Sequence, residues 1–238
     1  MPNPYFQFKK FTVWHDKCAM KVGTDGVLLG IWTTVFDESK TLSVIDVGTG
    51  TGLIAMIVAQ RNNKAIIDAI DIDKSACEQA IDNIGKSPFK DRINVIHKPF
   101  ADYRTDKKYD LIISNPPFFK KSLKCPDEKR SLARHNDSLP LKQLIGHATT
   151  MLTENGRIAL ILPVQQAEEL DFIIATHRLF TARRTEIFPA EGLQPKRFMI
   201  ELSSKTEAGD REMNTLTLET KDRKRTQQYA ELTKEFYL

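Results

Sequence analysis

LSVIDVGTGTG, residues 42–52, combines an apolar strand with a glycine-rich turn. A helical segment at about 53–61 follows directly, so a strand, a tight turn and a helix are expected in that order. Glycines let the backbone of such a turn approach a ligand closely, because they carry no side chain. The stretch therefore predicts an α/β fold with a ligand site at the carboxyl end of a parallel strand.

The spacing of Gly48, Gly50 and Gly52 differs from the dinucleotide-binding pattern, which has two residues before its last glycine. Asp46 stands just before the turn, where its negative charge would repel a pyrophosphate. A carboxylate there suits a ligand with a cationic end, such as the ammonium or sulfonium group of S-adenosylmethionine. We therefore predict that Asp46 and the three glycines bind this cofactor. The alternative is a strand–helix turn without a ligand.

The next two apolar strands add further candidate cofactor contacts. The strand at 65–70 ends at Asp71, about 20 residues after the first glycine, where βαβ folds place a ribose-binding carboxylate. Asp73 is better explained as the N-cap of a helix at 74–86. After a third strand at 93–97, Phe100 is a candidate to pack on the adenine ring.

A fourth apolar run, 109–114, leads into Asn115-Pro116-Pro117-Phe118. Two consecutive prolines cannot continue a strand ladder, so the chain leaves the sheet stiffly and fixes the directions of the Asn115 amide and the Pro116 carbonyl. Their oxygens can accept both hydrogens of an exocyclic amine on a base, which favours the pyramidal nitrogen that attacks a methyl donor. Phe118 would stack on the extruded base. The alternative is an ordinary proline turn.

The first part of the chain is rich in aromatic residues. Residues 1–20 are expected to form a hairpin or arm packed on the main domain, with a candidate strand at 8–13. A glycine-rich turn then opens a helix that ends near Phe36. Thr24 and the Gly23 backbone could bind the carboxylate of an amino-acid-like ligand at this helix start. Simple capping by Thr24 or Asp25 would need no ligand.

The second half of the chain lacks motifs of comparable strength. Residues 119–136 have no apolar periodicity and are expected to form a mobile loop. The elements expected beyond it are helices at 138–152 and 165–177, strands at 157–163, 183–188, 197–202 and 215–218, a charged hairpin or linker at 205–213, and a helix at the end, 229–238. The strands at 183–188 and 197–202 are predicted to form an antiparallel edge. No domain break is visible, so residues 1–238 are predicted to form a single domain.

Composition indicates a cytoplasmic enzyme. Hydrophobic residues make up 41% and charged residues 28% of the 238 residues. There is no apolar run of about 18 residues and no signal peptide, so no membrane association is expected. The three cysteines are far apart and have no metal-type spacing, which predicts free thiols and no metal.

Basic residues cluster beside the Asn-Pro-Pro turn and near the end of the chain. The net charge is only +4. However, Lys120, Lys121, Lys124, Lys129, Arg130 and Arg134 follow the turn closely, and Lys221, Arg223, Lys224 and Arg225 form a second group. A positive rim beside an active site suits a polyanion. Arg134 and His135 are candidates for phosphate contact, with a solvated surface as the alternative.

Together, the glycine turn, Asp71 and the Asn115–Phe118 turn resemble the class I S-adenosylmethionine-dependent methyltransferases that act on amino groups. HDKCAMKVGTDG at 15–26, IISNPPFF at 112–119 and the closing FYL resemble the bacterial valine tRNA adenine-37 N6-methyltransferases along essentially the whole chain.

This resemblance implies a doubly wound, Rossmann-like sheet of seven mostly parallel strands with a late antiparallel strand. It also implies methylation of the adenine N6 amine at position 37 of valine tRNA, with RNA contacts from Phe119, Lys120, Lys121, Arg134 and His135. We expect the enzyme to be a monomer. Two positions depart from the family. Pro99 replaces an acid near the cofactor adenine, where Asp102 could substitute, and Phe118 replaces a tyrosine.

Other functions remain open from the residues alone. The same turn could act on guanine in ribosomal RNA, on adenine in DNA or on a protein glutamine. A nicotinamide-dependent oxidoreductase is disfavoured by the glycine spacing, and a noncatalytic RNA-binding module is disfavoured by the intact Asn115 and Asp71. For methyl transfer we expect direct in-line chemistry without a general base, because the nitrogen becomes acidic only after alkylation.

Overall fold

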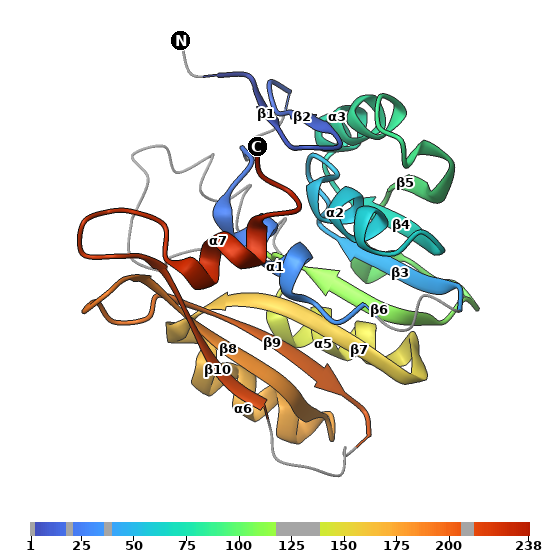
Figure 1. Ribbon diagram of the computed structural model, residues 1–238. Helices are drawn as coiled ribbons and strands as arrows, with labels where there is room; N and C mark the ends of the chain where they lie inside the picture. The colour runs from blue at the N-terminus through green and yellow to red at the C-terminus, as the bar shows by residue number, and fades with distance from the viewer. Residues whose placement is uncertain (1–2, 18–20, 36–39, 118–138, 206–211) are drawn as a thin grey trace, which may run out of the picture.

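The computed structural model describes residues 3–17, 21–35, 40–117, 139–205 and 212–238 (Figure 1). In these ranges an eight-stranded sheet has the order β10-β8-β9-β7-β6-β3-β4-β5. The strands are β3 (Leu42–Val47), β4 (Ala65–Asp71), β5 (Ile93–His97), β6 (Tyr109–Ser114), β7 (Leu152–Pro163), β8 (Phe180–Ala190), β9 (Arg197–Ser203) and β10 (Glu212–Glu219). One strand more is therefore present than the seven expected.

All neighbouring strands of this sheet are parallel except where β9 meets β7 and β8. The predicted late antiparallel strand is thus confirmed. The prediction that 183–188 and 197–202 form the edge of the sheet is wrong, because β10 pairs in parallel with β8 and covers it. This pairing satisfies backbone groups that an edge strand would leave exposed, and it buries Leu216.

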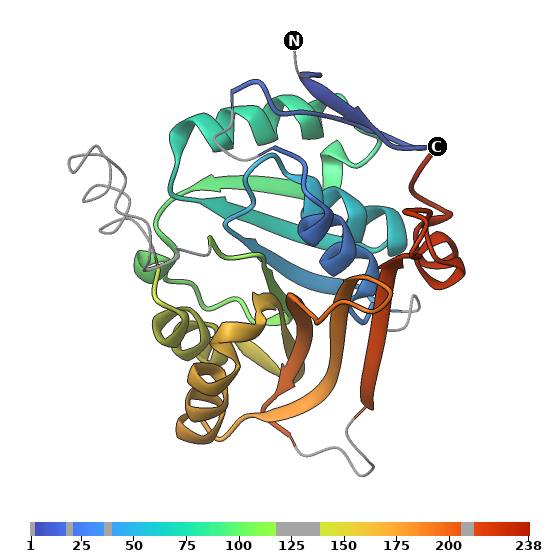
Figure 2. The same ribbon diagram turned by 90° about the vertical axis from the view of Figure 1, so that its left-hand side faces the viewer.

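Helices cover both faces of the sheet, as Figures 1 and 2 show. The helices α1 (Thr24–Trp32), α2 (Leu53–Arg61), α3 (Lys74–Gly85) and α7 (Gln227–Thr233) lie on one side, and α5 (Leu141–Thr150) and α6 (Ala167–Thr176) lie on the other. Side chains alternate along each strand, so in β3 Val44 packs in the first core and Ile45 in the second. None of the helices in the described ranges has the length and apolar character that a bilayer span requires.

Several helix ends differ from the predictions. α1 ends at Trp32, before the expected Phe36. α5 is shorter than predicted at both ends: it begins after Pro140, and it ends at Thr150 because Leu152 already belongs to β7. α7 spans Gln227–Thr233, earlier in the chain than the predicted final helix.

The amino-terminal hairpin pairs β1 (Tyr5–Gln7) with β2 (Thr12–Trp14). The prediction of a strand at 8–13 is wrong, because the Phe8 N–H donates to the Phe11 carbonyl and closes the turn of the hairpin there. The buried side chain of Asn83, in α3, accepts a hydrogen bond from the Trp14 N–H and donates one to the Trp14 carbonyl. It also donates to the Thr51 carbonyl over 2.9 Å. The hairpin is therefore linked through α3 to the glycine-rich turn.

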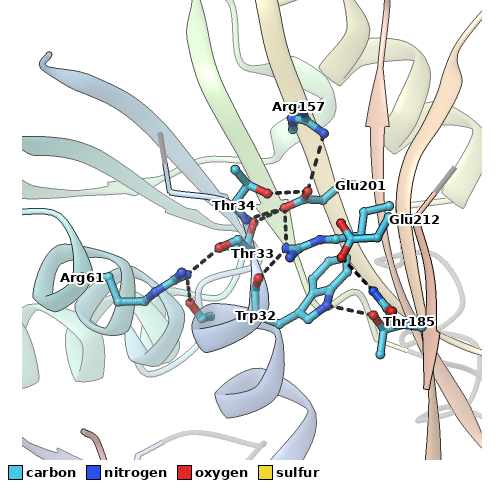
Figure 3. A network of polar contacts seen from close by, with 11 residues as sticks. Trp32, Thr33, Thr34, Arg61, Arg157, Thr185, Glu201 and Glu212 are labelled. Carbon is cyan, nitrogen blue, oxygen red and sulfur yellow. Dashed lines mark hydrogen bonds and ion pairs between the residues drawn. The ribbon is translucent and has the colours of Figure 1, made fainter. Parts of the chain in front are cut away.

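A buried carboxylate fixes the end of α1 to the sheet (Figure 3). Glu201 of β9 is fully buried and lies 3.4 Å from Arg183 and 3.7 Å from Arg157, on the neighbouring strands β8 and β7. It also accepts hydrogen bonds from the Thr33 hydroxyl and from the N–H and hydroxyl of Thr34. This network holds α1 so that its first turn lies at the carboxyl edge of the sheet, beside Asn115.

Candidate active site

A cavity of about 370 Å³ lies at the carboxyl ends of β3, β4 and β6. Seven of the predicted site residues line it: Gly48, Gly50, Asp71, Phe100, Asn115, Pro116 and Pro117. The cavity thus brings together the glycine turn, the candidate ribose carboxylate and the Asn-Pro-Pro corner, from three separate parts of the sequence. Phe118, Phe119, Lys120, Lys121, Arg134 and His135 lie outside the described residues.

The three glycines of the turn have different surroundings. All have positive φ angles, +72° for Gly48, +57° for Gly50 and +81° for Gly52, which side chains rarely adopt. A Cβ added at Gly48 or Gly50 would meet nothing within 4 Å, so both leave open space toward the cavity. A Cβ at Gly52 would lie 3.2 Å from the Ile84 side chain of α3. Gly52 is not on the cavity lining and allows close helix packing instead.

Asp71 is fixed at the cavity wall by two backbone groups. Its carboxylate accepts hydrogen bonds from the Gly50 N–H over 2.8 Å and from the Asp73 N–H over 3.0 Å. Burial raises the pKa of this carboxyl. Each carboxylate oxygen can accept more than one hydrogen bond, so Asp71 keeps the capacity to bind hydroxyl groups. Asp73 caps α3 through a 2.8 Å bond from the Ser75 N–H, as predicted.

Asp46 lies behind the turn and not on the cavity lining. One of its oxygens accepts bonds from the Thr49 hydroxyl over 2.6 Å and from the Ala55 N–H over 3.2 Å, so it braces the turn against α2. Complete burial raises the pKa of Asp46 to about 7. Its other oxygen is buried without a partner among the described residues. A direct contact between Asp46 and a cationic ligand remains a prediction.

Residues 115–117, which we call the Asn115 corner, are held to strand β3. The Ser114 hydroxyl donates to the Val47 carbonyl over 2.7 Å, so the end of β6 is fixed to the end of β3. A Cβ at Gly26 of α1 would lie 3.9 Å from the Asn115 amide nitrogen, which places this helix beside the corner. Gly23 and Thr24 begin the same helix but do not line the cavity. Their predicted contact with a carboxylate has no support from the cavity lining and remains a prediction.

An apolar wall closes the other side of the cavity. Phe100 is buried, and its ring contacts His147 edge-on with a centroid distance of 4.9 Å. Asp102 is exposed and absent from the cavity lining, so it does not take the place of the family acid there. Sequence reasoning missed Leu139, Gln143 and Leu144, which complete the wall from α5 and the residues before it. Their pattern is that of any amphipathic helix and gave no signal of a site.

The charges of the lining decide which ligand fits. Asp71 and Asp73 are on it, and Lys98 is its only cation among the described residues. Such a set does not favour a pyrophosphate, which needs cations and free N–H groups. The open glycine turn, the Asp71 carboxylate and the apolar wall suit a nucleoside that carries a positively charged group on its ribose. S-adenosylmethionine has this chemistry.

Comparisons with known proteins identify the family of this chain. A model of the methyltransferase small domain matches residues 30–177. A protein of Parabacteroides distasonis named tRNA1(Val) (adenine(37)-N6)-methyltransferase is 51% identical over 100% of this chain and 99% of its own length. A protein of the same name from Bacteroides thetaiotaomicron is 43% identical over the same shares.

Solved structures support the fold. A predicted O-methyltransferase from Agrobacterium tumefaciens superposes with a TM-score of 0.65 at 20% identity, covering 89% of this chain and 96% of that one. A putative class I S-adenosylmethionine-dependent methyltransferase from Listeria monocytogenes gives a TM-score of 0.59 at 12% identity, covering 80% and 64%.

Proposed function

The chain belongs to the family of the tRNA1(Val) (adenine(37)-N6)-methyltransferases and carries the methyltransferase small domain, and we propose that it methylates the N6 amine of adenine 37 in valine tRNA. S-adenosylmethionine supplies an activated methyl group when bound. One observation carries the proposal: the Asn115 corner lines the same cavity as Gly48, Gly50 and Asp71.

The corner would hold the acceptor nitrogen through its two exocyclic hydrogens. The Asn115 side-chain oxygen and the Pro116 carbonyl each accept one of them, which orients the lone pair of the nitrogen and favours the pyramidal geometry of the transition state. Because the donor is already activated, positioning and exclusion of water supply most of the rate. The nitrogen loses its proton after methylation, when it is far more acidic, so no general base is required.

The remaining site residues would hold the cofactor and the base. Gly48 and Gly50 let their backbone approach the ligand, Asp71 accepts hydrogen bonds from the ribose hydroxyls, and Phe100 packs on the adenine. Asp46 holds the turn in place through its hydrogen bonds to the Thr49 hydroxyl and the Ala55 N–H. Phe118 stacks on the extruded base.

The acceptor is assigned to tRNA because relatives that are 40–51% identical over the whole of this chain are named for it. Guanine in ribosomal RNA, adenine in DNA and a protein glutamine remain the alternatives for the same corner. We place the enzyme in the cytoplasm, where its substrate is found, as a monomer without a metal.

The test is incubation of the protein with labelled methyl donor and total tRNA from a strain that lacks the enzyme, followed by nucleoside mass spectrometry. We expect N6-methyladenosine in valine tRNA. Asn115→Ala should abolish turnover while cofactor binding, measured by calorimetry, survives. Asn155→Ala, an exposed position in β7, is the matched control. Near-normal turnover by Asn115→Ala would refute the role of the corner.

A further inference from the structure

Two loops with exposed cations lie side by side at the end of the sheet where the parallel strands have their carboxyl ends. Residues 191–196 join β8 to β9, and residues 220–226 join β10 to α7 (Figure 1, orange and dark red). The Glu191 N–H donates to the Glu219 carbonyl over 2.9 Å, and the Lys221 N–H donates to the Glu191 carboxylate over 3.4 Å. The loops therefore form one surface. We call it the basic edge, and its cations are Lys196, Lys221, Arg223, Lys224 and Arg225.

The basic edge and the Asn115 corner lie at the same end of the sheet, where the parallel strands have their carboxyl ends. β6 is parallel to β7, and the end of β7 at Pro163 pairs with the start of β9 at Arg197. The strand order places β8 three strands and β10 four strands from β6. At about 4.8 Å per strand, the basic edge lies roughly 14 to 19 Å from the corner. A single nucleotide held at the corner would not span this distance, whereas a polynucleotide would.

The lysines of the basic edge are free to bind an anion. Lys196, Lys221 and Lys224 are exposed, and within the described ranges no ion pair involves their side chains. At the opposite ends of the strands, two lysines are paired with acids: Lys107 lies 2.7 Å from Asp68, and Lys205 lies 2.6 Å from Glu154. An unpaired cation keeps its full attraction for a polyanion, so the clustered lysines of the basic edge form a surface suited to phosphate.

The acids of the basic edge do not cancel its charge. The cations outnumber Glu191, Glu219 and Asp222. In the part of the chain that the structure describes, the one ion pair of the basic edge, Arg223 to Glu219, is 3.5 Å long and largely exposed. Arg225 is held in place, because its guanidinium lies 4.8 Å from the ring centre of Tyr237. A guanidinium fixed in this way can bind a phosphate in bidentate geometry at a smaller entropic cost.

We propose that the basic edge binds the phosphate backbone of the RNA that presents the target base. This inference rests on the proposed function for the identity of the RNA. Phosphate contacts by lysine and arginine position a nucleic acid without reading its sequence. At this distance from the corner, they fix the part of the RNA next to the extruded base.

The test compares two triple variants that lose the same charge. Lys196→Ala/Lys221→Ala/Lys224→Ala removes the lysines of the basic edge. Lys40→Ala/Lys64→Ala/Lys90→Ala removes exposed lysines just before β3, β4 and β5, at the opposite edge. Binding of fluorescently labelled valine tRNA is measured by anisotropy over a range of salt concentrations. The first variant should lose about tenfold or more in affinity, and its slope of log K against log salt should shrink by about two to three.

Turnover supplies the second measurement. The KM for tRNA should rise in the first variant while kcat at saturating tRNA stays unchanged, because the basic edge does not touch the acceptor amine. The control variant should resemble the wild type in both assays.

Each outcome separates the basic edge from the proposed function. If both triple variants bind tRNA with the same affinity and salt slope, the basic edge is not the RNA surface, and an acidic protein becomes its better occupant. If the wild type methylates tRNA and the first variant keeps its KM, the inference fails while the proposed function stands. If the wild type binds tRNA through the basic edge without methylating it, the proposed function fails while the inference stands.

Discussion

Replacing Glu201 by glutamine should destabilise the protein more than any change of one surface charge. The carboxylate is fully buried, and it balances Arg183 and Arg157 while accepting three hydrogen bonds from Thr33 and Thr34 (Figure 3). Removing one partner of a buried ion pair leaves the other charge uncompensated, which costs about 3 to 5 kcal/mol. At about 2 to 4 °C per kcal/mol for a protein of this size, the Tm should fall by roughly 6 to 20 °C.

Urea denaturation followed by circular dichroism measures this loss as a lower midpoint with an unchanged m-value. Glu154→Gln is the matched control, because its ion pair with Lys205 is exposed and should contribute nothing measurable. A Glu201→Gln protein within about 0.5 kcal/mol of the wild type, the range of ordinary surface changes, would mean that the network adds no net stability.

Two further changes test the glycine turn and its brace. Gly50→Ala strains a left-handed residue by about 1 to 2 kcal/mol and should also weaken cofactor binding, whereas Gly52→Ala should lower stability without entering the cavity, because its Cβ meets Ile84. Calorimetry and urea denaturation separate the two, and equal cofactor affinities in both variants would contradict the assignment. The raised pKa of Asp46, about 7, means that its protonated form stabilises the fold at low pH and that this contribution disappears as pH rises from about 4 through 7. The ligand-free wild type should therefore lose stability across this range while Asp46→Asn loses less. Parallel pH profiles for the two proteins would refute this cause.

The parts of the fold that local chemistry determines could be predicted from the sequence. The strand, the turn and the helix from 42 to 61 follow from apolar runs and glycines that need left-handed angles. The Asn115 corner follows from two prolines that cannot continue β6. In each case the deciding residues are adjacent in the chain, so no distant contact was needed to recognise them.

The errors concern features that depend on distant parts of the chain. The pairing of β10 with β8 joins strands that are not consecutive in the chain, because β9 comes between them, and alternation within 215–218 gives no sign of which strand it meets. The different roles of Gly52 and Gly50 depend on α3, whose Ile84 packs against one and not the other. Likewise, the α5 wall of the cavity is defined only when the helix docks on the sheet.

The site depends on β3, because this strand lies between the two halves of the cavity. On one side the Gly48 N–H donates to the Ile70 carbonyl and the Gly50 N–H to Asp71, which ties the turn to the end of β4. On the other side the Ser114 hydroxyl donates to the Val47 carbonyl, which ties the same strand to the start of the corner. The cofactor residues and the acceptor corner are thus fixed to one another through backbone groups, and the Asn115 side chain takes no part in either tie. For this reason Asn115→Ala should separate binding from turnover.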